Sequence, residues 1–223
     1  MMDVEEKKKS FPGSAAYWEN RYAKGGNSGA GSRGEHAEFK AEVLNRFVEA
    51  NGVESVIEFG CGDGVQLAIA KYPRYLGLDV SSTQLRRTME RFADDPSKSF
   101  VHYNPEGFSD QAGFLKADLS LSLDVIFHLT EDDVYRSHME HVFGASHKYV
   151  VLYTSDADDP GMDGEFAPHI RHHPVLRDVE QYFPEWRLTS RIENPRPWSP
   201  ENLEGSISDF FIYERTKPAA KTS

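Results

Sequence analysis

Short apolar runs alternate with amphipathic stretches along most of this chain, separated by Gly, Pro, Asn and Ser residues. The apolar runs predict seven strands, at residues 55–59, 75–78, 100–103, 117–123, 148–153, 186–192 and 208–213. Apolar residues spaced three or four apart predict helices, at residues 36–50, 65–71, 81–92, 130–144 and 175–183. Because helix-linked strands end in a strand pair, the pattern predicts a doubly wound α/β fold. Its sheet is expected to be mostly parallel and seven-stranded, with an antiparallel edge hairpin.

Two of the predicted helices carry their own start signals. Ser81 is followed three residues later by Gln84, which is the spacing of a capping box. Thr130 and Asp133 have the same spacing ahead of an amphipathic stretch. We therefore expect Ser81 and Thr130 to cap these helices.

The segment before the first strand differs from the rest of the chain. Residues 17–22 (YWENRY) predict a short aromatic helix, and residues 25–34 are too rich in glycine to hold a regular structure alone. The glycine-rich segment is interpreted either as a lid that closes over a ligand and excludes water, or as a flexible linker. Together the two segments predict an N-terminal helical lid.

Length and composition indicate a single domain. The 223 residues fit one α/β domain, expected to span residues 14–216 between disordered tails at residues 1–13 and 217–223. No apolar run approaches the roughly 20 residues that cross a bilayer. Residues 1–10 are charged and lack the apolar core of a signal peptide. We therefore expect a cytoplasmic protein without a membrane partner.

Charge and cysteine content narrow the possible partners. The formal net charge is −11, whereas a nucleic-acid enzyme normally presents a basic surface to the phosphates. This charge argues against nucleic acid as a partner and favours a small-molecule substrate. The single cysteine, Cys61, excludes an intrachain disulfide and a cysteine-based zinc cluster. An exposed edge strand or the N-terminal helices could pair two copies, so a homodimer is possible.

A glycine-rich turn directly follows the first predicted strand. Residues 60–64 (GCGDG) let the backbone turn sharply and approach a ligand closely. Glu58 interrupts the apolar strand, which is costly unless its carboxyl group is hydrogen-bonded. Asp63 would repel a pyrophosphate, and the last two glycines lie one residue too close for a dinucleotide motif. Asp79 ends the second strand, where a carboxylate can accept two ribose hydroxyls.

Four segments resemble motifs of the class I S-adenosylmethionine (SAM) dependent methyltransferases, in the order found in that family. Residues 56–64 (VIEFGCGDG) are similar to the first motif, and residues 76–81 (LGLDVS) to the second. Residues 119–129 resemble the strand and loop beneath the transferred methyl group. Residues 17–22 resemble the aromatic lid helix of small-molecule members. The resemblance implies a Rossmann-like fold, SAM as cofactor and methyl transfer as the reaction.

The resemblance also implies which residues contact SAM. The glycines of the turn would contact its methionine part, and Asp79 its ribose. Either Asp118 or Asp124 would lie near the methionine ammonium; Asp124 is favoured because it follows its strand. Family members often have an acidic residue near the adenine, where this chain has His102-Tyr103-Asn104. The expected cofactor-binding residues are Trp18, Arg21, Glu58, Gly60, Cys61, Gly62, Asp63, Gly64, Asp79, Val80, Tyr103, Asn104 and Asp124.

Histidines are the candidate catalytic groups, because a base with a pKa near neutral suits removal of a proton from the methyl acceptor. His128 follows the fourth strand and would face the methyl group; the alternative is a histidine that packs on the lid or cofactor. His169 and Arg171 lie after the fifth strand and suggest a polar or anionic methyl acceptor. A solvated basic loop is the alternative there.

No metal site is predicted. His138 and His141 have a spacing that can share a metal ion, but surface positions on a helix are the favoured interpretation. Cys61 is interpreted as a packing residue rather than a nucleophile, since no base is paired with it in the sequence.

The expected function is methyl transfer from SAM to an oxygen or nitrogen of a small polar metabolite or biosynthetic intermediate, such as a sugar or a carboxylate. One alternative is a nucleic-acid or protein methyltransferase. Residues 122–125 (SLDV) do not form the Asn/Asp-Pro-Pro-Tyr/Phe loop of base-nitrogen chemistry, which argues against nucleic acid. The other alternative is a non-catalytic SAM-binding module, which the acidic residues of the cofactor motifs disfavour.

Overall fold

The computed structural model describes residues 11–160, 162 and 167–216. Most of the two predicted tails, residues 1–10 and 217–223, lies outside the described residues. Residues 11–13 precede the first described helix. The domain boundaries at residues 14 and 216 therefore stay a prediction. No helix in the described part of the chain is long and apolar enough to span a bilayer.

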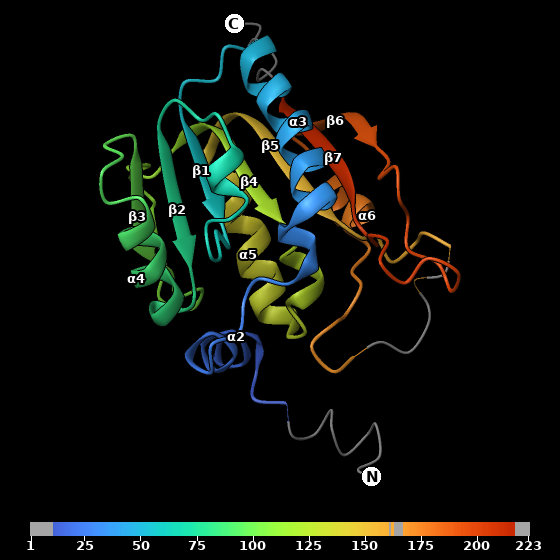
Figure 1. Cartoon of the computed structure of the whole chain (residues 1–223). Coiled ribbons are helices and arrows are strands. Elements are labelled where there is room, and N and C mark those ends of the chain that lie inside the picture. The colour runs from blue at the N-terminus through green and yellow to red at the C-terminus, as the bar shows by residue number, and fades with distance from the viewer. Residues whose placement is uncertain (1–10, 161, 163–166, 217–223) are drawn as a thin grey trace, which may run out of the picture.

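Seven strands form one sheet in the order β3-β2-β1-β4-β5-β7-β6 (Figure 1). Every neighbouring pair is parallel except the two pairs that involve β7. The strands are β1 (Val56–Phe59), β2 (Tyr75–Asp79), β3 (Lys98–His102), β4 (Ala117–Leu123), β5 (Ser146–Thr154), β6 (Trp186–Ile192) and β7 (Asp209–Arg215). The predicted mostly parallel sheet with its antiparallel hairpin is confirmed.

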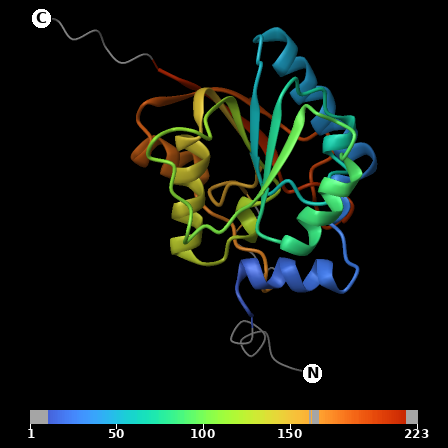
Figure 2. The ribbon, with the colours of Figure 1, turned by 90° about the vertical axis from the view of Figure 1, so that its left-hand side faces the viewer.

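Helices cover both faces of the sheet, as Figures 1 and 2 show. One face carries α3 (Gly34–Ala50) and α4 (Ser82–Arg91), and the other carries α5 (Asp132–Gly144) and α6 (Val175–Tyr182). A further helix, α2 (Ser14–Ala23), lies across the carboxyl ends of the strands. The doubly wound arrangement leaves this edge as the place where a ligand can approach the sheet.

Burial on both faces explains the apolar composition of the central strands. All four residues of β1 are buried. Ile57 and Phe59 pack in the core layer of α5 and α6, whereas Val56 packs in the layer of α3 and α4. This alternation follows the two-residue period of a strand. Glu58 is the exception to the apolar run, and its position at the end of β1 brings a carboxyl group to the ligand edge.

The order of the strands reverses direction between β1 and β4. The chain runs outward from β1 through β2 to β3, then returns to the other side of β1 as β4. The connections after β1 and β4 therefore diverge on opposite faces of the sheet. In open α/β sheets this point opens a crevice beyond the carboxyl ends of the strands. The predicted glycine turn and Asp124 both border it.

The prediction of a helix at residues 65–71 is wrong. This segment contains only a short 3₁₀ helix, Leu67–Ile69. The side chain of Asn45 on α3 donates to Ile69 O and accepts from Lys71 N. The Gln66 side chain likewise donates to Ala37 O. Packing against α3 thus takes backbone groups that an α-helix would pair internally.

The two predicted caps have different outcomes. Ser81 caps α4, since its Oγ accepts from Gln84 N at 3.0 Å. The prediction for Thr130 is wrong, because the N-cap residue of α5 is Glu131 and makes no side-chain cap. The carboxylate of Glu131 instead accepts a hydrogen bond from Ser14 N of α2. A tertiary contact has replaced the local capping interaction.

Candidate functional site

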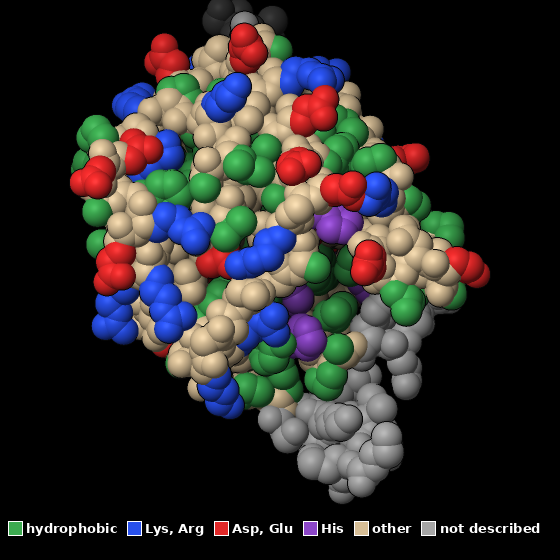
Figure 3. All heavy atoms as spheres, in the orientation of Figure 1, with side chains coloured by type: hydrophobic (Ala, Val, Ile, Leu, Met, Phe, Trp, Pro, Cys, Tyr) green, Lys and Arg blue, Asp and Glu red, His purple; other side chains and the backbone are tan. Residues whose placement is uncertain are grey.

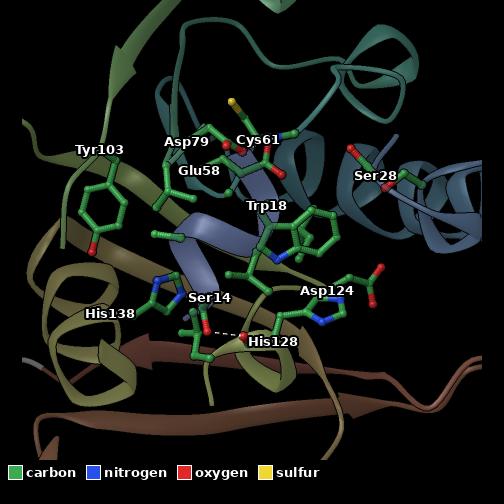
Figure 4. A pocket seen from close by; sticks show the side chains of 18 of the residues that line it. Ser14, Trp18, Ser28, Glu58, Cys61, Asp79, Tyr103, Asp124, His128 and His138 are labelled. Atoms are coloured by element: carbon green, nitrogen blue, oxygen red, sulfur yellow. Dashed lines mark hydrogen bonds between the residues drawn. The ribbon is translucent and has the colours of Figure 1, made fainter. Parts of the chain in front are cut away.

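A cavity of about 940 Å³, its open mouth included, lies at the point where the strand order reverses (Figure 4). Its walls come from α2, α3, α5 and the ends of β1, β2 and β4. Eleven of the residues predicted from the sequence line it, namely Trp18, Glu58, Gly60, Cys61, Gly62, Asp63, Asp79, Val80, Tyr103, Asp124 and His128. The predicted residues Arg21, Gly64, Asn104, His169 and Arg171 are not among the lining residues.

The glycine turn has the left-handed backbone that its sequence predicts. Gly60, Gly62 and Gly64 have φ values of 89°, 55° and 69°. A Cβ atom at Gly62 would lie 2.5 Å from Ser28 Oγ, so a side chain there would displace the segment above the turn. Gly64 packs against Phe92 and Thr88 instead of facing the cavity. Its role is therefore close packing of the turn on α4.

Asp79 joins the end of β2 to the glycine turn. Its carboxylate accepts from Gly62 N and from Ser81 N, both at 2.8 Å. Burial raises the pKa of Asp79, although these two backbone N–H groups oppose the shift. The carboxyl group is thus fixed in the cavity wall, with lone pairs left to accept from a ligand.

Glu58 is buried and hydrogen-bonded, as its place in an apolar strand requires. The Tyr75 hydroxyl donates to Glu58 Oε2 at 2.6 Å. Burial raises the pKa of Glu58 to about 7, against the opposing effects of Tyr75 and Lys40. Glu58 therefore changes its charge within the physiological pH range.

Asp63 holds the glycine-rich N-terminal segment onto the turn. Its carboxylate accepts from Arg33 at 2.8 Å and from Ser28 N at 3.1 Å, while Asp63 N donates to Ser28 Oγ. Burial opposes ionisation of Asp63, but these contacts outweigh it and keep its pKa below the usual value. Residues 25–34 are thus docked on the glycine turn, which favours the lid over the linker interpretation.

Asp124 is the polar centre of the opposite wall. It is the only non-glycine residue with positive φ (56°) among the described residues. It accepts from Lys40 Nζ at 2.7 Å and from Ser208 Oγ at 2.9 Å. Asp118, the other candidate, is bonded to Lys148 and to Glu54 N instead. Of the two aspartates, the structure places Asp124 at the cavity.

Lys40 was not predicted from the sequence. Its side chain is only 1% exposed, lies 5.2 Å from the Tyr153 ring centroid and lines the cavity. A signal was present, because Lys40 falls on the same helical face as Ala37, Ala41 and Leu44, which are all buried. A lysine on the buried face of an amphipathic helix requires a charged partner, which Asp124 supplies.

The structure separates the residues expected at the adenine. Tyr103 lines the cavity, and its hydroxyl is hydrogen-bonded to His141 Nδ1 at 2.7 Å. Asn104 lies outside the lining, and its side chain accepts from Glu106 N in the following turn. Arg21 donates to Asn27 O and lies over the Trp18 ring. Of Tyr103 and Asn104, only Tyr103 is placed to contact a ligand.

Helix α2 is anchored at both ends across the cavity mouth. Ser14 Oγ donates to His128 O at 2.7 Å, as Figure 4 shows, and Ser14 N donates to Glu131. In the middle of the helix, Glu19 accepts from Ser81 Oγ at 2.7 Å and from Thr83 N, and near the other end Tyr22 O accepts from Arg87 at 3.1 Å. Trp18 lies between these anchors and lines the cavity. The predicted aromatic helix therefore forms a lid.

His128 is held in one tautomer. His169 O can only accept, so the 3.0 Å contact makes His128 Nδ1 the donor and leaves a lone pair on Nε2. Burial lowers the pKa of His128 to about 4. The ring meets Trp18 edge-on at 4.9 Å and stacks on His169 at 5.5 Å. The site thus contains a neutral imidazole beside the lid.

The other two predicted catalytic residues lie farther out. His169 stacks on Tyr17 of the lid at 4.7 Å, and burial lowers its pKa. Arg171 is paired with Asp132 at 2.7 Å and donates to Thr130 O at 2.8 Å. His128 and His169 therefore come together, whereas the positive charge of Arg171 is held by α5.

His138 does not occupy the surface position favoured by the sequence. It is 2% exposed and is hydrogen-bonded to Ser122 on β4. It faces inward because α5 packs on the sheet through the face that also carries Met139 and Val142. No cluster of His, Cys, Asp or Glu suited to a metal ion occurs among the described residues. Cys61 is buried in the core, where burial raises its thiol pKa, in agreement with a packing role.

The fold is the Rossmann-like fold of the class I SAM-dependent methyltransferases. The chain is similar to the N-methyltransferase NodS from Bradyrhizobium japonicum WM9 in complex with S-adenosyl-L-homocysteine (14% identity, TM-score 0.69, covering 92% of this chain and 100% of that one). It is also similar to magnesium protoporphyrin IX methyltransferase from Synechocystis PCC 6803 with bound SAM (12%, TM-score 0.62, 93% and 99%).

A third similar structure is the methyltransferase domain of bacterial CtHen1-C (15% identity, TM-score 0.60, covering 80% of this chain and 97% of that one). No protein-family model and no curated protein matches the chain. At these sequence identities, the similarity to solved structures establishes the fold.

Proposed function

We propose that this protein transfers a methyl group from SAM to an oxygen or nitrogen of a small polar metabolite. The observation that carries the proposal is the concentration of carboxyl groups around a glycine turn. Glu58, Asp63, Asp79 and Asp124 line the cavity, and Lys40 is the only lysine or arginine among its lining residues. Such a site suits a cationic ligand with hydroxyl groups better than a phosphate.

The lining residues fit the chemical groups of SAM. The backbone of the turn at Gly60 and Gly62 lines the cavity, and the fixed Asp79 carboxylate can accept ribose hydroxyls. The ion pair of Lys40 and Asp124 offers a cation and an anion to the zwitterionic amino-acid end. When bound, SAM supplies an electrophilic methyl group on a sulfonium.

The protein's own residues would align the methyl acceptor and exclude water. Helix α2 closes the cavity mouth with Trp18, which removes competing solvent. His128 Nε2 carries a lone pair beside the lid and can accept a hydrogen bond from a hydroxyl or amine. With its lowered pKa, His128 is a weak base, so we propose that it mainly orients the methyl acceptor. Alignment of the two reacting groups then provides most of the acceleration.

The rim favours a polar over an anionic methyl acceptor. Arg171 is engaged by Asp132, and burial favours the neutral form of His169. Aromatic rings pack against His128, among them those of Trp18 on the lid and His169. A planar or hydroxylated molecule would meet these rings without the desolvation of an unpaired charge.

Calorimetry with SAM and S-adenosylhomocysteine, followed by a methyl-acceptor screen with labelled SAM, tests the proposal. The wild-type protein should bind both ligands and label a small molecule. Asp79→Asn should weaken binding about tenfold or more, because it replaces a charged acceptor for two hydroxyls. Asp118→Asn is the matched control at the opposite end of the sheet and should bind normally. Absence of binding to both ligands contradicts the proposal.

Nucleic acid is the second candidate, because basic side chains gather beside the cavity. Figure 3 shows Lys and Arg over the region of α2 and α4, and α4 carries the exposed residues Arg86, Arg87 and Arg91. RNA therefore belongs in the same screen. If RNA becomes labelled, and its binding weakens steeply as the salt concentration rises, then RNA is the methyl acceptor instead of a small molecule. Binding of SAM without any labelled product would indicate a non-catalytic module.

A further inference from the structure

A buried histidine at one end of the cavity has no role in the scheme above. His138 is 2% exposed, and its Nε2 lies 2.8 Å from the Oγ of Ser122, which is fully buried on β4. Its Nδ1 makes no hydrogen bond within the described residues. This Nδ1 atom is nevertheless not completely enclosed by protein atoms. Because His138 lines the cavity, we infer that Nδ1 opens into it.

The position of His138 marks the end of the cavity where the base of a nucleoside would lie. In Figure 4, Tyr103 and His138 lie on one side of the cavity, whereas Ser28 and Asp124 lie on the other. The proposed function places the amino-acid end of SAM near Asp124 and its ribose at Asp79. The base then extends toward Tyr103 and His138.

This end of the cavity has few groups free to accept a hydrogen bond from adenine. The Tyr103 hydroxyl is bonded to His141, and Asn104 lies outside the lining. An exocyclic amino group buried without an acceptor would lose binding energy. The Nδ1 lone pair of His138 is suited to this task when the ring proton is on Nε2.

We propose that His138 Nδ1 accepts a hydrogen bond from the exocyclic amino group of adenine, while His138 Nε2–H donates to Ser122 Oγ. The contact with Ser122 holds the ring in place, and the pair makes the pocket specific for adenine. This inference depends on the proposed use of SAM. It also explains how the site could recognise adenine although His102-Tyr103-Asn104 stands where family members often have an acidic residue.

The surroundings of the ring keep it in the form that the proposal requires. Burial lowers the pKa of His138 to about 3, so the imidazole is neutral and retains a lone pair at physiological pH. The Phe59 ring packs nearly perpendicular to it, with 6.0 Å between the centroids. Ser122 lies on a strand paired on both sides by the sheet, which fixes the position of its hydroxyl.

Binding of S-adenosylhomocysteine and its hypoxanthine counterpart, S-inosylhomocysteine, tests the proposal by calorimetry. Hypoxanthine replaces the amino donor with a carbonyl acceptor, so the wild-type protein should prefer the adenine ligand. His138→Phe and Ser122→Ala should weaken adenine binding by about three- to tenfold and remove most of this preference. His173→Phe, a change at a buried histidine outside the cavity lining, should leave both affinities unchanged.

Nitrogen-15 NMR of the wild-type imidazole gives a measurement that does not depend on variants folding. The proposal requires the proton on Nε2 and a shift of the Nδ1 resonance when S-adenosylhomocysteine binds. A proton on Nδ1 in the complex overturns it, as does an unchanged base preference in folded His138→Phe. If the wild-type protein binds neither ligand, the proposed function fails as well; binding with unchanged preference overturns this inference alone.

Discussion

The carboxyl groups of the cavity differ in pKa, because burial and hydrogen-bond partners affect each of them differently. Glu58 has its pKa raised to about 7 by burial, whereas Asp63, paired with Arg33, has its pKa lowered. One carboxyl group therefore titrates near neutral pH while the other stays charged. A cationic ligand should respond to this difference, since ionised Glu58 attracts a sulfonium or ammonium.

The affinity for SAM should therefore rise with pH relative to that for S-adenosylhomocysteine, which lacks the sulfonium charge. Glu58 is mostly neutral below pH 7 and mostly ionised above it, so the ratio of affinities should increase about threefold or more from pH 6 to pH 8. Glu58→Gln should make the ratio independent of pH. Calorimetry at both pH values measures it, with Glu54→Gln as the control. A constant ratio in the wild type contradicts the expectation.

At this scale the sequence predicts residues whose role is set by their neighbours along the chain. Glu58, Gly60 and Asp79 occupy strand ends and a turn, so local pattern places them in the cavity. Lys40 and Arg171 depend on partners from distant segments, Asp124 and Asp132. A charged residue on a helix or loop does not reveal in sequence whether such a partner exists.

Helix α2 shows how a short element is held by side chains rather than by a large apolar contact. Of its residues, only Ser14 and Tyr22 are buried. The helix is fixed by hydrogen bonds along its length, including those of Glu19 with Thr83 and Ser81, which also keep the pKa of Glu19 low. An element held in this way can open without disturbing the sheet.

Loss of the Glu19 anchor should speed ligand release. Glu19→Ala removes hydrogen bonds to a charged group, and we expect S-adenosylhomocysteine to dissociate about tenfold faster. The thermal midpoint should change little, because α2 lies outside the two core layers. Stopped-flow displacement measures the rate, and Glu90→Ala on the exposed face of α4 is the control. Equal release rates in both variants would show that this contact does not hold the lid.

Elements with a clear hydrophobic period and a local stop signal are predictable from this sequence. Helix α4 starts where Ser81 indicates because the capping contact lies within the same segment. The segment at residues 65–71 also has apolar residues, but Asn45 ties its backbone to α3, and the Gln66 side chain donates to Ala37 O of that helix. Tertiary hydrogen bonds of this kind cannot be predicted from the local pattern of apolar and polar residues.

For the whole molecule, buried neutral histidines should reduce stability in acid. His138 has a folded pKa of about 3 and an ordinary value of 6.5, so the unfolded chain binds more protons between these values. Stability therefore falls as pH drops below 6.5, by up to about 1.4 kcal/mol per pH unit for this group. His128, with a pKa of about 4, adds a similar contribution over a narrower range.

The variant His138→Gln should lose less stability than the wild type on acidification. Urea unfolding at pH 6.5 and pH 4.5 gives the comparison, because the other titrating groups, Glu58 among them, are the same in both proteins and cancel in the difference. We expect the difference in unfolding free energy between the two proteins to change by about 2 kcal/mol over this interval. His147→Gln, an exposed histidine on β5, should match the wild type. Parallel pH profiles for wild type and His138→Gln would be incompatible with a buried neutral ring.

The insertion of β7 between β5 and β6 has a consequence for how this fold can diversify. Because β6 runs in the same direction as β5, the β6–β7 connection emerges at the ligand edge, where Ser208 reaches Asp124 and Asn194 contacts Tyr153. Its ends are fixed by the strand ladder, so insertions or deletions within residues 195–205 leave the sheet register intact. The surface beside Asp124 can therefore change through one loop while the glycine turn on the other side of the cavity keeps its sequence.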